Sequence, residues 1–380
     1  MLDVAGALAL IPDRGGDFQM IYNSTAAWAA GHAPYAVTGT PTTNLNHPVL
    51  WLVVWPFLQF SPINAFIAWT LLSIALLAAT AIWMAPVVGI SAWETTILTL
   101  AATGTAFELG LGQIAFLLMV LLTGAWWCER TGRNAAAGAC IGLLCVLKPF
   151  FGLFPLMLIW RRAYRNLTTC VLTVVGGYLL GWLLAGNDGY AAWLENLRHV
   201  TWTWHIFNGS IWGAASRMFE VQQTAIGTRW TPLLVSPLAA HLFVALGIVA
   251  TLFVLWRGLR SANIDEQYAL VALASLLLSP LGWVYNLPVL VGPVLSVLAR
   301  RPSRWLWPIG ALALWPYPLL VNRQYGKLGT ATVGQISTIV VAGLLLAVYA
   351  SVRARAGNTV ITPMSQPTDQ LPLGLGTSAN

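Results

Sequence analysis

The chain has 380 residues and a net charge of +7; 58% of its residues are hydrophobic and only 8% are charged. Soluble domains carry about 25% charged residues, so a soluble core of this length could not cover its surface with so few charges. The composition therefore excludes a soluble globular protein. It predicts a polytopic membrane protein built from helices, because backbone that faces lipid must form its hydrogen bonds internally.

The apolar runs predict an all-α fold with about eleven membrane-crossing helices, some of them short or paired in hairpins. The expected elements are, in chain order, a short or re-entrant helix at 48–60, a span at 62–86, a hairpin of 95–109 and 113–127, a hairpin of 135–147 and 150–160, a span at 167–185, a polar loop at 186–232, a span at 233–256, a hairpin of 268–279 and 284–299, and spans at 305–320 and 333–352.

The basic residues cluster at the ends of apolar runs, for example at Arg161-Arg162 and Arg300-Arg301. This is the positive-inside pattern of a membrane protein, and it does not indicate binding to nucleic acid. Most arginines lie on the inner side if residues 1–47 are placed outside. We therefore expect an extracytoplasmic segment at 1–47, a membrane domain at 48–352 and a disordered cytoplasmic tail at 353–380.

Two further features bear on compartment and cofactors. The four cysteines form no CxxC motif, so neither a disulfide framework nor a zinc site is predicted, and we expect no metal and no cofactor. The apolar run at 4–11 is too short to span a bilayer, which needs about 20 residues. We expect the natural reading frame to begin upstream of Met1.

This topology brings several polar pieces to the outer face: Asp17, the hairpin tips at Glu108/Gln113, Lys148 and Trp283/Tyr285, and the 186–232 loop. Ionisable groups at membrane depth cost roughly 2.5–3.5 kcal/mol on insertion scales, so they usually face a cavity or a partner. Simpler roles are also open. Asp17 could cap a helix, Lys148 could snorkel toward water, and Glu108 could be a satisfied polar residue in a turn.

Taken in order, these pieces resemble glycosyltransferase family 87. The motifs that carry the resemblance are Gly16-Asp17-Phe18 with Tyr22, Gly31-His-Ala-Pro34-Tyr35, Asn46-His47-Pro48, Gly112-Gln113, Leu147-Lys148-Pro149, Asn208-Gly-Ser210 with Arg217, and Ser279-Pro280-Leu-Gly-Trp283. There are departures. His47 replaces a proline of the family pattern, Val284-Tyr285-Asn286 replaces its histidine after the tryptophan, and the family's first membrane helix is missing.

The resemblance implies a GT-C-type fold and an inverting glycosyltransferase. Its activity would be transfer of a hexose, most often mannose, from a polyprenyl-phosphate donor to a glycolipid or polysaccharide acceptor. The reaction would occur at the outer face of the bacterial cytoplasmic membrane. Asp17 is the candidate general base. Lys148 and Arg217 would supply positive charge to the leaving phosphate, and Gln113 and Asn208 would supply hydrogen bonds. The remaining candidate substrate-binding residues are Tyr22, Tyr35, His47, Ser210, Trp283 and Tyr285.

Two alternatives stay open at this point. Transfer of arabinofuranose from its polyprenyl phosphate is compatible with the same residues, because the choice of sugar depends on the shape of the pocket. A flippase or transporter of lipid-linked sugars is a different class of protein. Transporters of that kind often contain inverted repeats with paired broken helices, and the sequence has no such internal symmetry.

Overall fold

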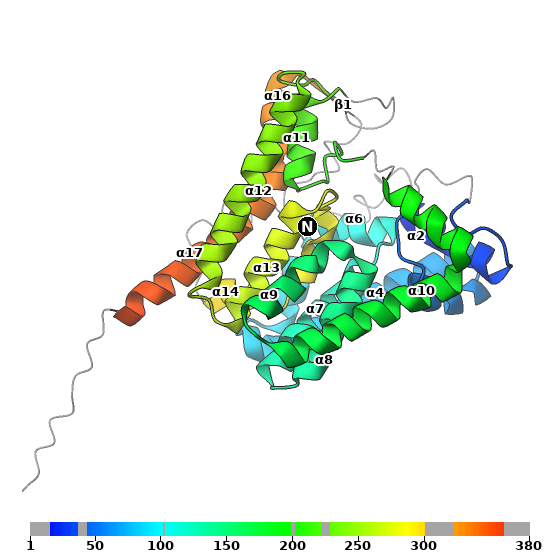
Figure 1. Cartoon of the computed structure of the whole chain (residues 1–380), viewed down its shortest axis with the longest axis horizontal. Coiled ribbons are helices and arrows are strands. Elements are labelled where there is room, and N and C mark those ends of the chain that lie inside the picture. The colour runs from blue at the N-terminus through cyan, green and yellow to red at the C-terminus, as the bar shows by residue number, and fades with distance from the viewer. Residues whose placement is uncertain are drawn as a thin grey trace, which may run out of the picture.

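A computed structural model describes residues 16–36, 44–101, 103–198, 202–221, 229–300 and 323–360. These ranges are almost entirely helical (Figure 1). The α-helices and short 3₁₀ helices (η) are α2 Gly16–Ala29, α3 Leu50–Val54, η1 Trp55–Gln59, α4 Pro62–Val88, α5 Ala92–Ala101, α6 Thr103–Leu111, α7 Ala115–Arg130, α8 Asn134–Leu147, η2 Pro149–Gly152, α9 Leu153–Trp160, α10 Tyr164–Arg198, α11 Ile211–Phe219, α12 Pro237–Leu259, α13 Ile264–Leu278, η3 Val284–Leu290, α14 Pro293–Arg300, α16 Lys327–Ala331, η5 Val333–Gln335 and α17 Ile336–Val360.

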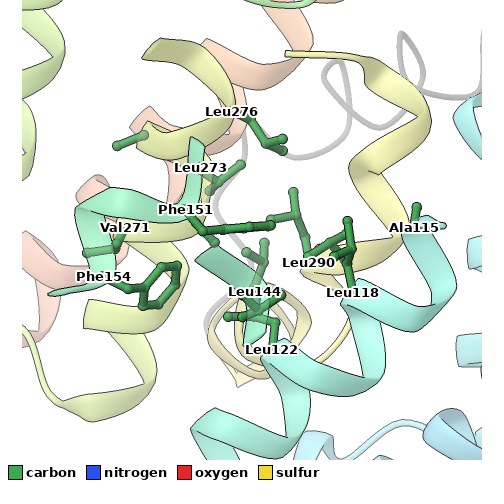
Figure 2. Close-up of a cluster of buried hydrophobic side chains, with 14 of the residues drawn as sticks. Ala115, Leu118, Leu122, Leu144, Phe151, Phe154, Val271, Leu273, Leu276 and Leu290 are labelled. Carbon is green, nitrogen blue, oxygen red and sulfur yellow. The ribbon is translucent and has the colours of Figure 1, made fainter. Parts of the chain in front are cut away.

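The core is centred on α13, which is buried along almost its whole length. A helix that is apolar on every side is stable only when it is surrounded by other helices. Figure 2 shows how α7, α8, α9 and η3 supply those surroundings. The labelled side chains there come from α7, α8, η2, α9, α13 and η3 and meet in one cluster: Leu118 and Leu122, Leu144, Phe151 and Phe154, Val271, Leu273 and Leu276, and Leu290.

Four helices among the described residues are long and apolar enough to cross a membrane, or five if the bent pair of α6 and α7 counts as one. They lie at Pro62–Val88, Tyr164–Arg198, Pro237–Leu259 and Lys327–Ala356. The prediction of about eleven crossings is not confirmed. Several predicted spans are helices of 8 to 15 residues, and 15 residues of helix extend only about 22 Å. The predicted span at 305–320, the run at 4–11 and most of the predicted tail lie outside the described residues.

Two predicted connections differ from the structure. The segment from residue 186 was predicted to be a loop, but α10 continues to Arg198 after a break at Gly186, where φ is +67°, and α11 forms further along. The predicted tight hairpin at 113 is a bend of 119° between α6 and α7. Both differences arise because polar residues in this chain lie on helices as well as in turns. Hydropathy alone does not distinguish a polar helix from a polar turn.

Buried acids tie the helices together at the end of the bundle opposite the hairpin tips. Asp265, near the start of α13, accepts hydrogen bonds from Arg130 of α7 and Arg300 of α14. The next residue, Glu266, pairs with Arg355 of α17 at 2.8 Å. Buried carboxylates require such partners, because an unpaired buried charge is strongly destabilising. The arginines that the sequence assigned to the inner side therefore fix the ends of α7, α14 and α17 around α13.

A second group of helices projects from this core. Figure 1 shows α12 and α17 lying along each other, with α11 and α16 near their far ends. A short parallel pair of strands, β1 (Arg229–Trp230) and β2 (Gln324–Tyr325), also lies at that end. The Trp230 and Tyr325 rings stack there with centroids 4.7 Å apart. This group holds the 202–219 segment against the bend at 279–283.

Candidate functional site

Asp17 lies in the first turn of α2 and contacts Gln113 from the bend between α6 and α7. The side-chain amide of Gln113 donates a hydrogen bond to Asp17 Oδ2, although the two residues are far apart in sequence. A carboxylate is favoured at this place because the N-terminal end of a helix carries partial positive charge. The sequence placed both residues at the same end of the membrane domain, and the structure confirms that they meet.

The bend that carries Gln113 depends on a glycine and on an aromatic cluster. Gly112 has φ +69°, and a Cβ on it would lie 2.6 Å from the Cβ of Phe18 in α2. The indole of Trp69 donates to the Gln113 backbone carbonyl at 3.1 Å, and its ring packs against Phe18. The close approach of the bend to α2 is therefore built into the fold. It holds the Gln113 amide against Asp17.

Glu108 is a second buried acid beside this bend. Its side chain is 1% exposed, and its Oε1 accepts the backbone N–H of Ala115 at the start of α7. Its backbone carbonyl accepts the N–H groups of Gly112 and Gln113. Its Oε2 has no hydrogen-bond partner among the described residues. Glu108 thus organises the bend with two of its oxygens and leaves a third oxygen buried and unpaired.

Lys148 reaches the same place from the end of α8. Pro149 follows it and restricts Lys148 to an extended backbone, so the helix ends at Leu147. The Lys148 ammonium donates to Asn46 Oδ1 at 3.1 Å and interacts electrostatically with Asp17 and Glu108. An ammonium has three N–H donors, and Asn46 uses one of them. Lys148 is therefore a cation that interacts with two carboxylates and has donors still available.

The loop that carries Asn46 is held in place by its neighbours. The Tyr35 hydroxyl donates to the Asn46 backbone carbonyl at 2.7 Å, and the Asn46 backbone N–H donates to Asn44 Oδ1 at 2.9 Å. Behind the loop, the indole of Trp193 in α10 donates to the Leu45 carbonyl at 3.2 Å. Burial raises the pKa of Tyr35, so its hydroxyl stays protonated and remains a donor.

His47 and Tyr22 pack inside the protein. The His47 ring lies among Tyr178, Tyr190 and Trp193 of α10, with centroid distances of 4.8, 6.1 and 4.8 Å. Burial lowers the pKa of His47 to about 4, so its imidazole is neutral at pH 7. The Tyr22 hydroxyl donates to the carbonyl of Phe60 at 2.9 Å. Both residues brace the segments next to Asp17 and Asn46, and substrate contact by either stays a prediction.

Asn208, Ser210 and Arg217 form an internal hydrogen-bond network. Asn208 donates to the carbonyl of Pro280 at 2.8 Å and accepts the backbone N–H of Ser210 at 3.1 Å. The Ser210 hydroxyl accepts from Gly213 and caps α11. Arg217 is 0% exposed and donates to the backbone carbonyls of Asn208 and of another loop residue. These contacts shape the 202–219 segment, and the substrate-binding role inferred for the three residues stays a prediction.

Trp283 and Tyr285 join this network to the acids. Their rings stack with centroids 5.4 Å apart and an angle of 15° between planes. Trp283 pairs through its backbone with Asn208, whereas Tyr285 interacts electrostatically with Asp17 and Glu108. The structure therefore gathers Asp17, Gln113, Lys148 and Tyr285 of the predicted set around Glu108. Asn208, Ser210 and Arg217 lie behind Trp283.

Sequence reasoning assigned no separate role to Asn46. It placed Glu108 among the polar pieces at the outer face but gave it no part in the chemistry. Asn46 carried a signal, because the Asn44-x-Asn46 spacing is typical of an asparagine side chain that bonds the backbone two residues on. Glu108 carried one too, since it is an acid within an apolar helix. As for metals, the described residues contain no group of three His, Cys, Asp or Glu side chains placed to hold an ion.

The family model for glycosyltransferase family 87 matches residues 44–280. The matched region contains Asn46, Glu108, Gln113 and Lys148, four of the residues gathered at the site. The chain belongs to glycosyltransferase family 87. The expectation that the resemblance raised is confirmed at this level.

One curated relative is the polyprenol-phosphate-mannose-dependent alpha-(1-2)-phosphatidylinositol mannoside mannosyltransferase of Mycolicibacterium smegmatis. It is 31% identical over 219 residues, which is 53% of this chain and 46% of the relative. The chain thus matches about half the length of that relative. No solved structure matches the chain. Family membership and the long apolar helices together describe a multi-pass membrane protein.

Proposed function

We propose that this chain transfers mannose from a polyprenyl-phosphate donor to a glycolipid acceptor. The observation that carries the proposal is the meeting of Asp17, Gln113 and Lys148 within a family of glycosyltransferases. An acid and a cation beside each other are what sugar transfer from a phosphate requires. The mannosyl donor and the lipid acceptor are those named for the Mycolicibacterium relative, and they are proposed here by analogy with it.

Asp17 is the general base of the proposed reaction. As the acceptor hydroxyl attacks the anomeric carbon, its proton passes to the Asp17 carboxylate and a new O–C1 bond forms. The bond between C1 and the phosphate oxygen breaks, and the electron pair leaves with the polyprenyl phosphate. Gln113 orients the Asp17 carboxylate by donating its side-chain amide N–H to Oδ2. A positioned base of this kind contributes about 10²–10⁴-fold to the rate.

Lys148 binds the phosphate that leaves. Its ammonium is anchored by Asn46 through one N–H and keeps two N–H donors for phosphate oxygens. Phosphate gains negative charge as the C1–O bond breaks, and a preorganised cation in a site with little water stabilises that charge more than bulk water does. Tyr285 and Trp283 provide a stacked aromatic wall against which a sugar face can pack.

The proposed site faces the extracytoplasmic side. The ends of α7, α14 and α17 that carry arginine lie at the other end of the bundle, and the bias of arginine toward the cytoplasm supports this orientation. The donor lipid would then be held in the outer half of the bacterial cytoplasmic membrane.

The experiment compares donors directly. Purified protein in lipid nanodiscs is incubated with an acceptor lipid extract and with radiolabelled polyprenyl-phosphate mannose or polyprenyl-phosphate arabinose in parallel. The proposal predicts labelled mannolipid and no labelled arabinolipid. Labelled product from the arabinose donor alone would mean that the transferred sugar is arabinose and not mannose. Movement of label across proteoliposome membranes without any new glycosidic bond would contradict a transferase and favour a flippase.

A further inference from the structure

In the part of the chain that the structure describes, one carboxylate oxygen of Glu108 is buried without a hydrogen-bond partner, which is unusual. The side chain is 1% exposed, and its Oε2 has no hydrogen-bond partner of good geometry among the described residues, although the Phe116 N–H also lies near this carboxyl group. A buried acceptor without a donor is costly, so such atoms in native proteins usually meet a ligand or an ordered water. The other oxygen, Oε1, is already occupied by the Ala115 N–H. The orphan atom is therefore fixed in place by its partner oxygen.

We propose that Glu108 Oε2 accepts a hydrogen bond from a ring hydroxyl of the donor sugar and thereby helps to select it. The inference rests on the proposed function. In this proposal Glu108 contacts the sugar ring of the donor, whereas Lys148 contacts its phosphate. A sugar hydroxyl is an O–H donor, which is the group that a carboxylate oxygen lacks here.

The surroundings favour a hydroxyl over the other ligands that a carboxylate could take. A phosphate oxygen of the donor has no proton to donate to Oε2, and Lys148 is the group placed to bind it. A metal ion would need further oxygen or nitrogen ligands, and the described residues offer no group of three His, Cys, Asp or Glu side chains. The Lys148 ammonium, which interacts electrostatically with both acids, already supplies a positive charge there. Tyr285, on the neighbouring η3, presents an aromatic ring near the same acid.

The position of Glu108 relative to the other groups also suits a sugar. Lys148 marks where the phosphate would lie, and the phosphate is bonded to C1 of the sugar. Asp17 marks where the attacking acceptor would approach C1 from the opposite face. Glu108 interacts electrostatically with both residues, and in the proposed arrangement it contacts the ring that connects these two points. A hydroxyl of that ring is then the nearest donor to Oε2.

The test measures sugar transfer by the wild type and by Glu108→Gln from the full donor and from a series of deoxy donors. Each deoxy donor lacks one ring hydroxyl of the sugar that the wild type transfers. Gln keeps a carbonyl oxygen for the Ala115 N–H but places an NH₂ group where Oε2 was. In the wild type, one deoxy donor should lose about 10- to 100-fold in kcat/KM, the range for a hydrogen bond to a charged group. Glu108→Gln should lose a similar factor with the full donor and little more with that deoxy donor.

The control is Glu94→Gln, which alters an exposed acid on α5 and should match the wild type with every donor. Equal losses for each deoxy donor in the wild type and in Glu108→Gln would overturn the assignment of Glu108 while leaving the transferase intact. Should the Gln variant fail to fold, the wild-type series decides alone: no deoxy donor losing more than about threefold would also overturn it. Absence of transfer by the wild type from any donor would instead refute the proposed function, and Glu108 with it.

Discussion

Replacing Gly104 with alanine should separate α6 from η3 and disable the site. A Cβ on Gly104 would lie 2.2 Å from the carbonyl oxygen of Val284 and 3.2 Å from the Cα of Tyr285. Non-bonded carbon and oxygen atoms need more than 3 Å, so the two elements must move apart by roughly 1 Å. Glu108 lies one turn after Gly104 on the same face of α6. The movement therefore shifts Glu108 away from Tyr285.

The expected magnitude follows from that displacement. A misplacement of about 1 Å in a catalytic site can cost roughly 100-fold in rate, and overpacking costs about 1–3 kcal/mol in stability. Sugar transfer and thermal unfolding of purified protein measure the two effects. The matched control is Gly124→Ala in α7, where the nearest atom to the new Cβ is Cys140 Sγ at 3.9 Å. That variant should be as active as the wild type. Gly104→Ala with activity within about threefold of the wild type would refute the packing argument.

Three further predictions concern charge, sidedness and pH. Lys148→Met should reduce kcat by roughly 10²–10³-fold with little change in folding, as loss of a preorganised donor does; near-normal transfer would mean that Lys148 only snorkels. A cysteine replacing exposed Ala33 should react with an impermeant thiol reagent from outside, and one replacing exposed Thr131 should not; the reverse pattern would invert the topology. Burial lowers the pKa of His47 and of His205 to about 4, below the unfolded value of about 6.5. Thermal stability should therefore fall as the pH drops from about 6.5 toward 4, because unfolding then takes up protons. A constant melting temperature over that interval would contradict the burial of both imidazoles.

The meeting of Asp17, Gln113 and Lys148 could be predicted from the sequence. Each is a polar residue at the end of an apolar run, and the positive-inside pattern assigns those ends to one side of the membrane. The end of α8 could be predicted as well, because Lys148 precedes a proline. These inferences need only the order of the residues and the distribution of charge along the chain, and both can be read from the sequence.

The roles of Arg217 and Glu108 could not be predicted in this way. Sequence shows that each is charged, and charge near a proposed site favours a binding role. The structure places Arg217 in bonds to backbone carbonyls, inside a network that no spacing rule anticipates. It places Glu108 with one oxygen paired and one unpaired, a distinction that exists only after α6 and α7 have packed. The predicted number of crossings is not confirmed for a similar reason, since short apolar helices can be buried by their neighbours without crossing lipid.

The most direct test of the account compares Asp17→Asn with Asp17→Ala in transfer from labelled polyprenyl-phosphate mannose. Asn preserves an oxygen that can accept from the Gln113 amide, and it suits a helix N-terminus about as well as Asp. It cannot remove a proton from the acceptor. The account predicts that Asn lowers turnover by about 10²–10⁴-fold with normal donor binding and stability. Asn with more than about a tenth of wild-type turnover, and Ala less stable by about 1 kcal/mol, would make Asp17 a helix-capping residue and contradict its role as the base.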